Sequence, residues 1–304
     1  MPTKNLGCFV ISNTLFDEQN RFDPEAQRKH FQRLVAAKIG VFVGGGGSGN
    51  AFALTRDEYR HLVRVAKEEL KGKVPFRIMG YEPRSAQQYI DLYNSIKEYE
   101  PDGMQIYSLD VGHGVRPSEK MIEGYFRDVL DVVKIPSILS SHFFAGYLIP
   151  IPMLKSLLKD YPQIVGINAS TPDIGYLVEV REELGDRVEL HAGGIGQALT
   201  VLGLGGNGHL AGEGNMIPKI CVSVIDNWRA GNLEGAFEAY ALQLRLYTGM
   251  SQFYGRFDLG ERLGIPGRRS RRMRLQPTEE QQRAFDQWAA TIDFDKIRRI
   301  EGLN

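Results

Sequence analysis

The polar side chains best suited to chemistry in this 304-residue chain follow short apolar runs. Ser140 and His142 close the run that begins at Ile135, and Asn168 stands near the end of another run at 163–170. Because alternate side chains of a strand point to opposite faces, Ser140 and His142 are expected to share a face. Histidine titrates near neutral pH without perturbation, so His142 is the best candidate for a general acid or base. A hydrogen-bonded strand-end histidine without a catalytic role is an equally good interpretation.

Asn168 and the pair Asp110 and His113 are further catalytic candidates. The amide of Asn168 can donate a hydrogen bond to a carbonyl or an oxyanion, although a structural amide that satisfies neighbouring backbone groups is the alternative. Asp110 and His113 stand in the segment SLDVGHG and are candidates for a second acid–base pair. A mobile glycine-rich loop is the alternative for that segment.

The strongest binding signal is the sequence GGGGSGN at residues 44–50. A loop of glycines presents backbone N–H groups that no side chain covers, and such a loop leading into a helix binds anions. No Gly-Lys-Ser/Thr follows, so it is not a P-loop. We expect it to bind a small carboxylate, with a tight strand-to-helix turn as the alternative. The residues expected to take part are Gly46, Gly47, Ser48, Gly49 and Asn50.

A metal site and a phosphate site are weaker hypotheses. Residues with suitable metal ligands are scattered along the chain, without a compact motif such as HxH or HExxH. The segment HAGGIG, which begins at His191, resembles the phosphate loops of some barrels. We predict no metal and no cofactor. The scattered ligand residues are His142, His191, Glu82, Asp110 and Glu213.

These candidates lie in a repeating pattern of apolar runs about thirty residues apart, with helix-like segments between them. Eight strands that alternate with helices predict an α/β fold, a (β/α)8 TIM barrel, and an open doubly wound sheet is the alternative. The active site of such a barrel lies at the carboxyl ends of the strands. This rule selects the candidates above and adds Glu213 and Asn215, at the end of the eighth run, as substrate-binding residues. The runs begin at Gly7, Ile39, Val74, Asp102, Ile135, Gln163, Arg187 and Gly206.

Helix signals complete the pattern. Asp23 followed by a proline predicts a helix start, and Thr55 with Glu58 forms a capping box that opens another helix. Helical sequence continues after the eighth run, in NLEGAFEAYALQLRLYTGM and TEEQQRAFDQWAATI. We therefore expect the barrel at 1–225 and a helical C-terminal extension at 226–304, packed on the barrel.

Composition excludes several classes of function. Hydrophobic residues make up 42% of the chain and charged residues 24%, an ordinary balance for a globular protein. The formal net charge is zero, which gives no general attraction to nucleic acid or to a membrane. The two cysteines, Cys8 and Cys221, offer no disulfide framework, and no apolar run reaches the roughly 20 residues of a membrane span. We therefore expect a cytoplasmic protein. The basic run GRRSRRMR at 267–274 is expected to be a solvated loop or a subunit contact.

Several segments resemble, in the same order, motifs of the dihydrodipicolinate synthase / N-acetylneuraminate lyase superfamily. GGGGSGNAFALTRDEY resembles its glycine-hydroxyl loop and the helix that follows, and RPSEKMI resembles its loop after strand four. VGINAST stands where the family has Gly-Ile-Lys-Glu, and LGGNGHLAGEGNMIP resembles its strand-eight segment. The resemblance extends from about Leu6 to Gly249. It implies a (β/α)8 barrel with a helical C-terminal part, usually assembled as a tetramer.

The resemblance also separates this chain from the family's chemistry. The family uses a lysine at the end of strand six to form a Schiff base with a 2-oxo acid such as pyruvate. That position is Asn168 here, and an amide cannot form an imine. The family's proton-relay tyrosine matches Ser140, and its carboxylate-binding arginine falls near Ala145. No lysine lies at a predicted strand end. Lys219, which follows the strand-eight loop, is interpreted as part of a helix start, with a substitute nucleophile as the alternative.

We therefore predict a divergent lyase of this superfamily that acts on a small oxo or hydroxy carboxylic acid without a Schiff base. It is expected not to be a dihydrodipicolinate synthase. His142 would serve as acid or base, with Asp110 as a second candidate and with Asn168, Ser140 and Ser48 orienting the substrate. A non-catalytic carboxylate-binding barrel and a metal-dependent aldolase-like enzyme are the alternatives. The expected partners are the small acid and other copies of the chain, in a dimer or tetramer, without nucleic acid or membrane.

Overall fold

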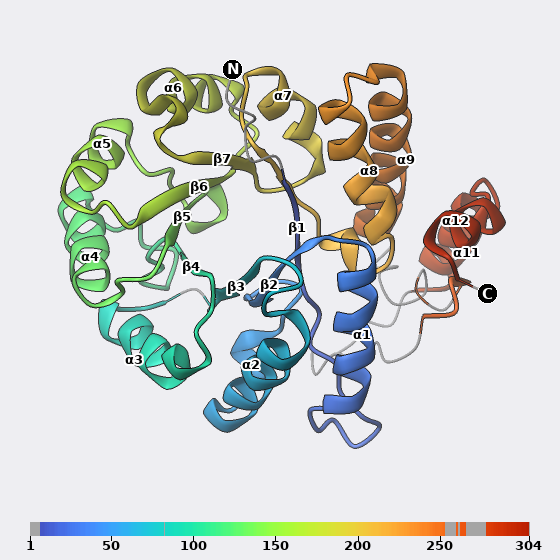
Figure 1. Ribbon diagram of the computed structural model, residues 1–304, viewed down its shortest axis with the longest axis horizontal. Coiled ribbons are helices and arrows are strands. Elements are labelled where there is room, and N and C mark those ends of the chain that lie inside the picture. The colour runs from blue at the N-terminus through green and yellow to red at the C-terminus, as the bar shows by residue number, and fades with distance from the viewer. Residues whose placement is uncertain (1–6, 82, 253–259, 261, 266–277, 304) are drawn as a thin grey trace.

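The structure is a computed structural model that describes residues 7–81, 83–252, 260, 262–265 and 278–303 (Figure 1). Eight parallel strands close into a barrel in which each strand pairs with the next one in sequence and β1 pairs with β8. The predicted TIM barrel is confirmed, and the alternative of an open sheet is wrong. The strands are β1 (Gly7–Ile11), β2 (Gly40–Gly44), β3 (Phe76–Met79), β4 (Gly103–Ile106), β5 (Ser137–His142), β6 (Ile164–Ser170), β7 (Glu189–Ala192) and β8 (Gly208–Leu210).

Helices follow the strands and form a ring around the barrel (Figure 1). The interior of the barrel holds a separate cluster of buried apolar side chains, which includes Phe42 and Ile138. Residues at the alternating strand positions, such as Val41 and Ile78, are buried beneath the helices. The helices of the ring are α1 (Pro24–Ala36), α2 (Arg56–Leu70), α3 (Ala86–Ile96), α4 (Glu119–Val132), α5 (Ile151–Asp160), α6 (Ile174–Leu184), α7 (Ala198–Gly203) and α8 (Pro218–Arg229).

Side-chain caps fix the two helix starts that the sequence predicts. Oδ1 of Asp23 accepts hydrogen bonds from the backbone N–H groups of Glu25 and Ala26, at 3.1 and 3.0 Å. Thr55 and Glu58 cap each other's backbone N–H groups at the start of α2, at 3.2 and 2.9 Å. Both predicted helix starts are confirmed.

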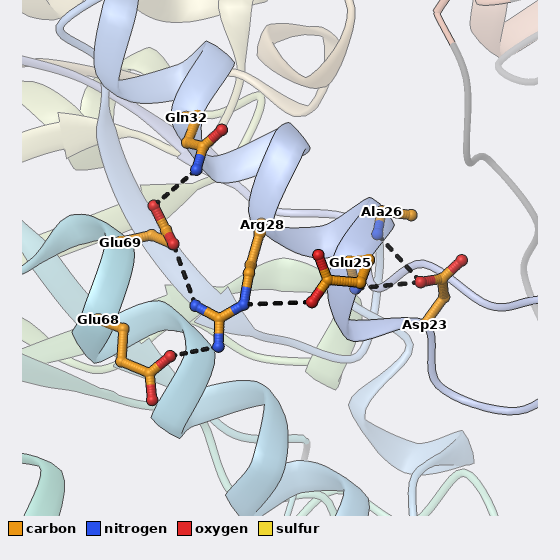
Figure 2. Close-up of polar contacts among 7 residues, drawn as sticks. All are labelled: Asp23, Glu25, Ala26, Arg28, Gln32, Glu68 and Glu69. Carbon is orange, nitrogen blue, oxygen red and sulfur yellow. Dashed lines mark hydrogen bonds and ion pairs between the residues drawn. The ribbon is translucent and has the colours of Figure 1, made fainter.

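Arg28 joins α1 to α2 across their outer faces (Figure 2). Its Nη1 lies 3.0 Å from Oε1 of Glu69, its Nη2 contacts the carboxylate of Glu68, and its Nε lies 3.7 Å from Oε1 of Glu25. Gln32 donates to the other oxygen of Glu69 at 3.1 Å. The hydrogen bonds to Glu68 and Glu69 raise the pKa of the Arg28 guanidinium. Because the network is partly exposed to solvent, it orients α1 and α2 more than it stabilises the fold.

The described part of the C-terminal extension includes α9 (Leu233–Gln252), α11 (Glu279–Ala289) and α12 (Phe294–Glu301). These helices confirm the predicted helical segments after the eighth strand. Glu301 at the end of α12 accepts hydrogen bonds from the backbone N–H groups of Lys219 and Ile220, at 3.2 and 3.0 Å. A carboxylate at this position satisfies N-terminal amides of α8 and anchors the extension to the barrel.

Three further expectations concern the domain boundary, the basic run and membrane spans. The expected division at residues 225 and 226 falls within α8, so the eighth helix of the barrel runs across it. The basic run at 267–274 lies outside the described residues. In the described part of the chain, no helix combines the length and the apolar character that a membrane crossing requires.

Candidate functional site

Three buried polar residues meet inside the barrel near the carboxyl ends of β4, β5 and β6. Asn168 on β6 is in register with Ser140 on β5, and the side chains of both are buried. Nδ2 of Asn168 donates a hydrogen bond to Oε1 of Gln105 on β4. Oδ1 of Asn168 is also buried and has no hydrogen-bond partner among the described residues. The site therefore contains one acceptor atom that the protein itself leaves unsatisfied.

Gln105, which sequence reasoning missed, and Tyr107, a strand-end residue to which it gave no role, also belong to the site. Both lie on β4 or at its end and face the barrel interior, where Tyr107 joins the apolar cluster. The hydroxyl of Tyr107 donates to Sδ of Met79 at 2.9 Å. It also lies 3.4 Å from where a Cβ on Gly45 would be, so it sits directly under the glycine loop. The sequence signal that could have identified them is a polar residue, Gln105, two positions before Tyr107 in an otherwise apolar run, a spacing that places both on one face of a strand.

His142 ends β5 on the same face as Ser140, as the spacing predicts. It is partly buried and lies against the rings of Phe143 and Phe144, with ring centroids 6.4 and 5.0 Å away. Burial lowers the pKa of His142 below its usual 6.5. The imidazole is therefore neutral at pH 7 and can accept a proton. Phe144 is 76% exposed, which leaves an apolar rim beside this base.

The glycine loop at 44–50 folds back tightly on itself. Gly44 and Gly45 both have φ of +94°, and a Cβ on Gly49 would lie 1.7 Å from the carbonyl oxygen of Gly44. Asn50 is left-handed as well, and its Nδ2 donates to the carbonyl of Ser48 at 3.1 Å. The amide of Asn50 therefore supports the loop itself.

The loop reaches the eighth strand but does not lead directly into α2. Oγ of Ser48 lies 3.5 Å from where a Cβ on Gly212, after β8, would be. A 3₁₀ turn at Ala51–Ala53 follows the loop, and Thr55 and Glu58 cap the start of α2. In this part of the structure, the N-terminus of α2 therefore does not lie directly after the glycines, where the sequence predicts it. Anion binding would rest on the loop's own amides, which include those of Gly46 and Gly47.

Asp110 lies at the rim of the barrel and contacts the loop after β3. Its Oδ1 lies 3.1 Å from Nη1 of Arg84 and accepts a hydrogen bond from the backbone N–H of Gly112 at 2.8 Å. His113 follows in a left-handed conformation with φ of +54° and is exposed. The contacts of Asp110 thus hold two loops together.

Glu213 and Asn215 are buried, but their side chains contact the scaffold. Glu213 accepts a hydrogen bond from Nε2 of Gln243 on α9 at 2.5 Å. The Oδ1 atom of Asn215 accepts from the backbone N–H of Asn13 at 2.7 Å and lies 2.9 Å from Nε2 of His30. Its Nδ2 donates to the backbone carbonyls of Ile11, the last residue of β1, and Gly212, which follows β8. The structure thus joins Asn215 to α1 and the strand ends, apart from Asn168 and Ser140.

The histidine and carboxylate residues of the metal hypothesis that the structure describes form no metal cluster. His191 faces the barrel interior and meets the ring of Phe9 edge-on, with centroids 5.3 Å apart. Burial, aided by the charge of Arg77, lowers the pKa of His191 to about 3. Within the residues that the structure describes, no three side chains of His, Cys, Asp or Glu are grouped to hold a metal ion. Glu82 lies outside those residues.

The loop of the phosphate hypothesis packs closely against β6. A Cβ on Gly193 would lie 1.7 Å from Oγ of Ser170. The helix that follows, α7, is only six residues long. The segment is therefore a close strand-to-strand contact rather than an open cradle.

A cavity of about 230 Å³ lies at the opposite, amino end of the barrel, where Gly7 and Gly40 line it. Arg77 and Glu189 form an ion pair there at 3.0 Å, and the Arg77 guanidinium lies 4.5 Å above the ring of Phe9. In (β/α)8 barrels this end serves stability, while the carboxyl ends carry the chemistry. We therefore keep the candidate site at the carboxyl ends.

Comparisons with known proteins agree on one family. The dihydrodipicolinate synthetase family matches residues 4–283. The 4-hydroxy-tetrahydrodipicolinate synthase of Methanopyrus kandleri is 25% identical over 235 residues, which is 77% of each chain. The enzyme of the same name from Thermus thermophilus is 28% identical over 225 residues, 73% of this chain and 74% of that one.

Solved structures show the same fold at lower identity. YagE, a prophage protein of the dihydrodipicolinic acid synthase family from E. coli K12 in complex with pyruvate, has a TM-score of 0.83 and 20% identity. The alignment covers 98% of this chain and 99% of YagE. The 4-hydroxy-tetrahydrodipicolinate synthase of Methylacidiphilum fumariolicum SolV has a TM-score of 0.84 and 17% identity, over 98% of each chain.

Proposed function

This chain belongs to the dihydrodipicolinate synthetase family, a family of lyases, and from that premise we propose that it acts without a lysine Schiff base. Its substrate is a small oxo or hydroxy carboxylic acid, bound at the carboxyl ends of the barrel strands. Its activity differs from that of the 4-hydroxy-tetrahydrodipicolinate synthases it resembles. The proposed reaction is an elimination, hydration or isomerisation next to the carboxylate.

The observation that carries the proposal is the composition of the strands. None of the eight strands contains a lysine, and β6 carries the buried Asn168. An amide nitrogen is neither basic nor nucleophilic, so Asn168 cannot attack a ketone. Lys219 lies in the first turn of α8, where its backbone is bound to Glu301 and its Nζ lies beside Gly302. These positions support chemistry that proceeds through hydrogen bonding and proton transfer.

The proposed roles follow from the groups at the site. The amides of the glycine loop and Ser48 bind the substrate carboxylate. His142, neutral near pH 7, takes a proton from the carbon next to that carboxylate and returns it to the departing oxygen, which leaves as water in an elimination. Asn168 and Ser140 orient the reacting group, and Asp110 shapes the rim. YagE, which is in complex with pyruvate, supports a small acid as the ligand class.

A non-catalytic carboxylate-binding barrel is the second candidate, and one observation favours it. The buried polar groups nearest the centre of the site are the amides of Asn168 and Gln105 and the hydroxyls of Ser140 and Tyr107, which are hydrogen-bonding groups. The third hypothesis, a metal-dependent aldolase, is tested by trace-metal analysis. The described residues offer no cluster of metal-donor side chains for it. A cytoplasmic location and a homo-oligomeric state stay predictions.

The experiment is a turnover screen of small oxo and hydroxy acids by NMR, run beside thermal shift. We expect turnover of at least one acid, and a loss of about 10²- to 10⁴-fold in His142→Ala, the range of a lost general base. His61→Ala is the matched control, because His61 lies on α2 against Phe22. Stabilisation by acids without turnover would replace the enzyme with the non-catalytic alternative.

A further inference from the structure

We propose that the position beside Asn168 is built to receive a hydroxyl group rather than a carbonyl group. The preferred ligand of the site is then a small hydroxy acid, and a matched oxo acid binds more weakly. The inference rests on the proposed function, because it takes the ligand to bind at the carboxyl ends of the strands. It deepens that function by choosing between its two substrate classes.

The nitrogen and the oxygen of the Asn168 amide differ in their hydrogen bonding. Nδ2 donates to Oε1 of Gln105, whereas Oδ1 is buried without a hydrogen-bond partner in the described structure. The whole residue is 2% exposed, so bulk water does not compensate Oδ1. A buried acceptor left unpaired is costly, and a ligand that donates a hydrogen bond to it removes that cost.

Gln105 is the positioning residue that sets this orientation. It is buried on β4, and its backbone carbonyl accepts a hydrogen bond from the hydroxyl of Tyr89 on α3. β4, β5 and β6 lie side by side in the barrel (Figure 1), so the Gln105 side chain reaches Asn168 past β5. The hydrogen bond from Nδ2 to Oε1 of Gln105 places the nitrogen of the Asn168 amide toward β4 and leaves Oδ1 on the other side.

Neither polar neighbour in register with Asn168, Ser140 on β5 or His191 on β7, forms a hydrogen bond with Oδ1. His191 on β7 is in register with Asn168 and faces the same interior. Its ring rests edge-on against Phe9, and its own Nδ1 is buried and unpartnered too among the residues described. A bound ligand would therefore have to supply the hydrogen-bond donor for Oδ1 of Asn168.

A hydroxyl group and a carbonyl group differ in whether they can donate a hydrogen bond to Oδ1. A hydroxyl donates one hydrogen bond to Oδ1 and still accepts others, whereas a carbonyl oxygen only accepts. Binding an oxo acid would therefore leave Oδ1 desolvated and unpaired. From the usual cost of such an orphaned group, the hydroxy acid is expected to bind about 10- to 100-fold more tightly.

The test compares matched acids by isothermal titration calorimetry at one pH. The pairs are each enantiomer of lactate against pyruvate, and each enantiomer of 2-hydroxyglutarate against 2-oxoglutarate. Tighter binding of one hydroxy enantiomer by about 10-fold or more supports the inference. Equal binding, or tighter binding of the oxo acids, overturns it and leaves the proposed carboxylate site intact. Failure of all these acids to bind overturns the inference together with the proposed function.

Two variants test the roles of Oδ1 of Asn168 and of Gln105. The measured quantity is the dissociation constant of the oxo acid divided by that of the matched hydroxy acid. Asn168→Leu removes the acceptor, and Gln105→Met frees the Asn168 amide to turn, so in both the ratio should fall to about threefold or less. Asn94→Leu on the exposed face of α3 is the control and should keep the wild-type ratio. A ratio unchanged in folded Asn168→Leu would overturn the inference. If that variant does not fold, the Gln105→Met ratio decides in the same way.

Discussion

Inside the barrel, Nδ2 of Asn168 on β6 donates a hydrogen bond to Oε1 of Gln105 on β4. This amide pair occupies the place where relatives are expected to carry an imine-forming lysine. It leaves Oδ1 of Asn168 buried without a partner among the described residues. We propose that this pair stands in place of the family's nucleophile as a hydrogen-bonding group, and the proposed chemistry depends on that replacement.

Activity should depend on pH through His142. Burial lowers the pKa of this imidazole below 6.5. A general base works in its deprotonated form, so kcat/KM should be constant near pH 7 and should fall only as the pH drops through a value below 6.5. A pH–rate profile measures this limb. Survival of the same acid limb in His142→Ala would assign it to another group.

Asn215 should contribute to stability rather than to substrate affinity. Its amide joins the backbone of Ile11, Asn13 and Gly212 to the ring of His30. Asn215→Ala would orphan several buried groups, so we expect a loss of more than about 2 kcal/mol in the free energy of unfolding. Urea denaturation measures it. A raised KM with unchanged stability would return Asn215 to the substrate site.

The glycine loop should tolerate a side chain at one position and not at another. A Cβ on Gly49 would meet the carbonyl of Gly44 at 1.7 Å, whereas a Cβ on Gly47 has no atom within 4 Å. Gly49→Ala should cost about 1–3 kcal/mol of unfolding free energy, and Gly47→Ala should stay within about 0.5 kcal/mol. Equal unfolding midpoints for the two variants would show that the loop is not folded as described.

Stability should fall between pH 7 and pH 5 because of buried histidines. Burial lowers the pKa of His30 and His191 to about 3 and that of His209 to about 4. Between those values and the unfolded pKa near 6.5, the unfolded chain binds protons that the folded chain excludes. The stabilisation is therefore complete above pH 6.5 and lost below it, at up to roughly 1.4 kcal/mol per pH unit for each histidine.

Urea unfolding at pH 7.5 and 5.0 tests this dependence. The window lies above the range in which most carboxylates titrate. Glu301, whose pKa burial raises, acts in the opposite direction, but as one group against three histidines. Greater stability at pH 5.0 than at pH 7.5 would contradict the neutral, buried state of these histidines.

The fold was predictable because its signals are local and repeated. Apolar runs that alternate with capped helices, such as those begun by Asp23 and Thr55, specify strands and helices independently of their partners. Eight repeats leave few architectures other than a closed barrel. The position of the site followed from the barrel rule, and the shared face of Ser140 and His142 followed from the strand period.

The contacts of individual polar groups were beyond the reach of the sequence. Gln105 stands 63 positions from Asn168 in the chain, and only the closure of the barrel brings their amides together. Asn215 and Glu213 follow β8 as expected, but a 3₁₀ turn at Gly212–Asn215 directs Glu213 toward α9 and Asn215 toward α1. Side-chain direction after a strand depends on such turns, which a period of two does not describe.

The most direct test of the central claim is a trapping experiment with pyruvate. The wild-type protein is incubated with pyruvate, reduced with borohydride and measured by intact mass spectrometry, beside a 4-hydroxy-tetrahydrodipicolinate synthase as a positive control. We propose that Asn168 stands in place of the family's lysine, and none of the eight strands contains a lysine, so we expect an adduct on the control and none on this protein. A pyruvate adduct on any lysine of this chain would contradict the proposed lysine-free chemistry.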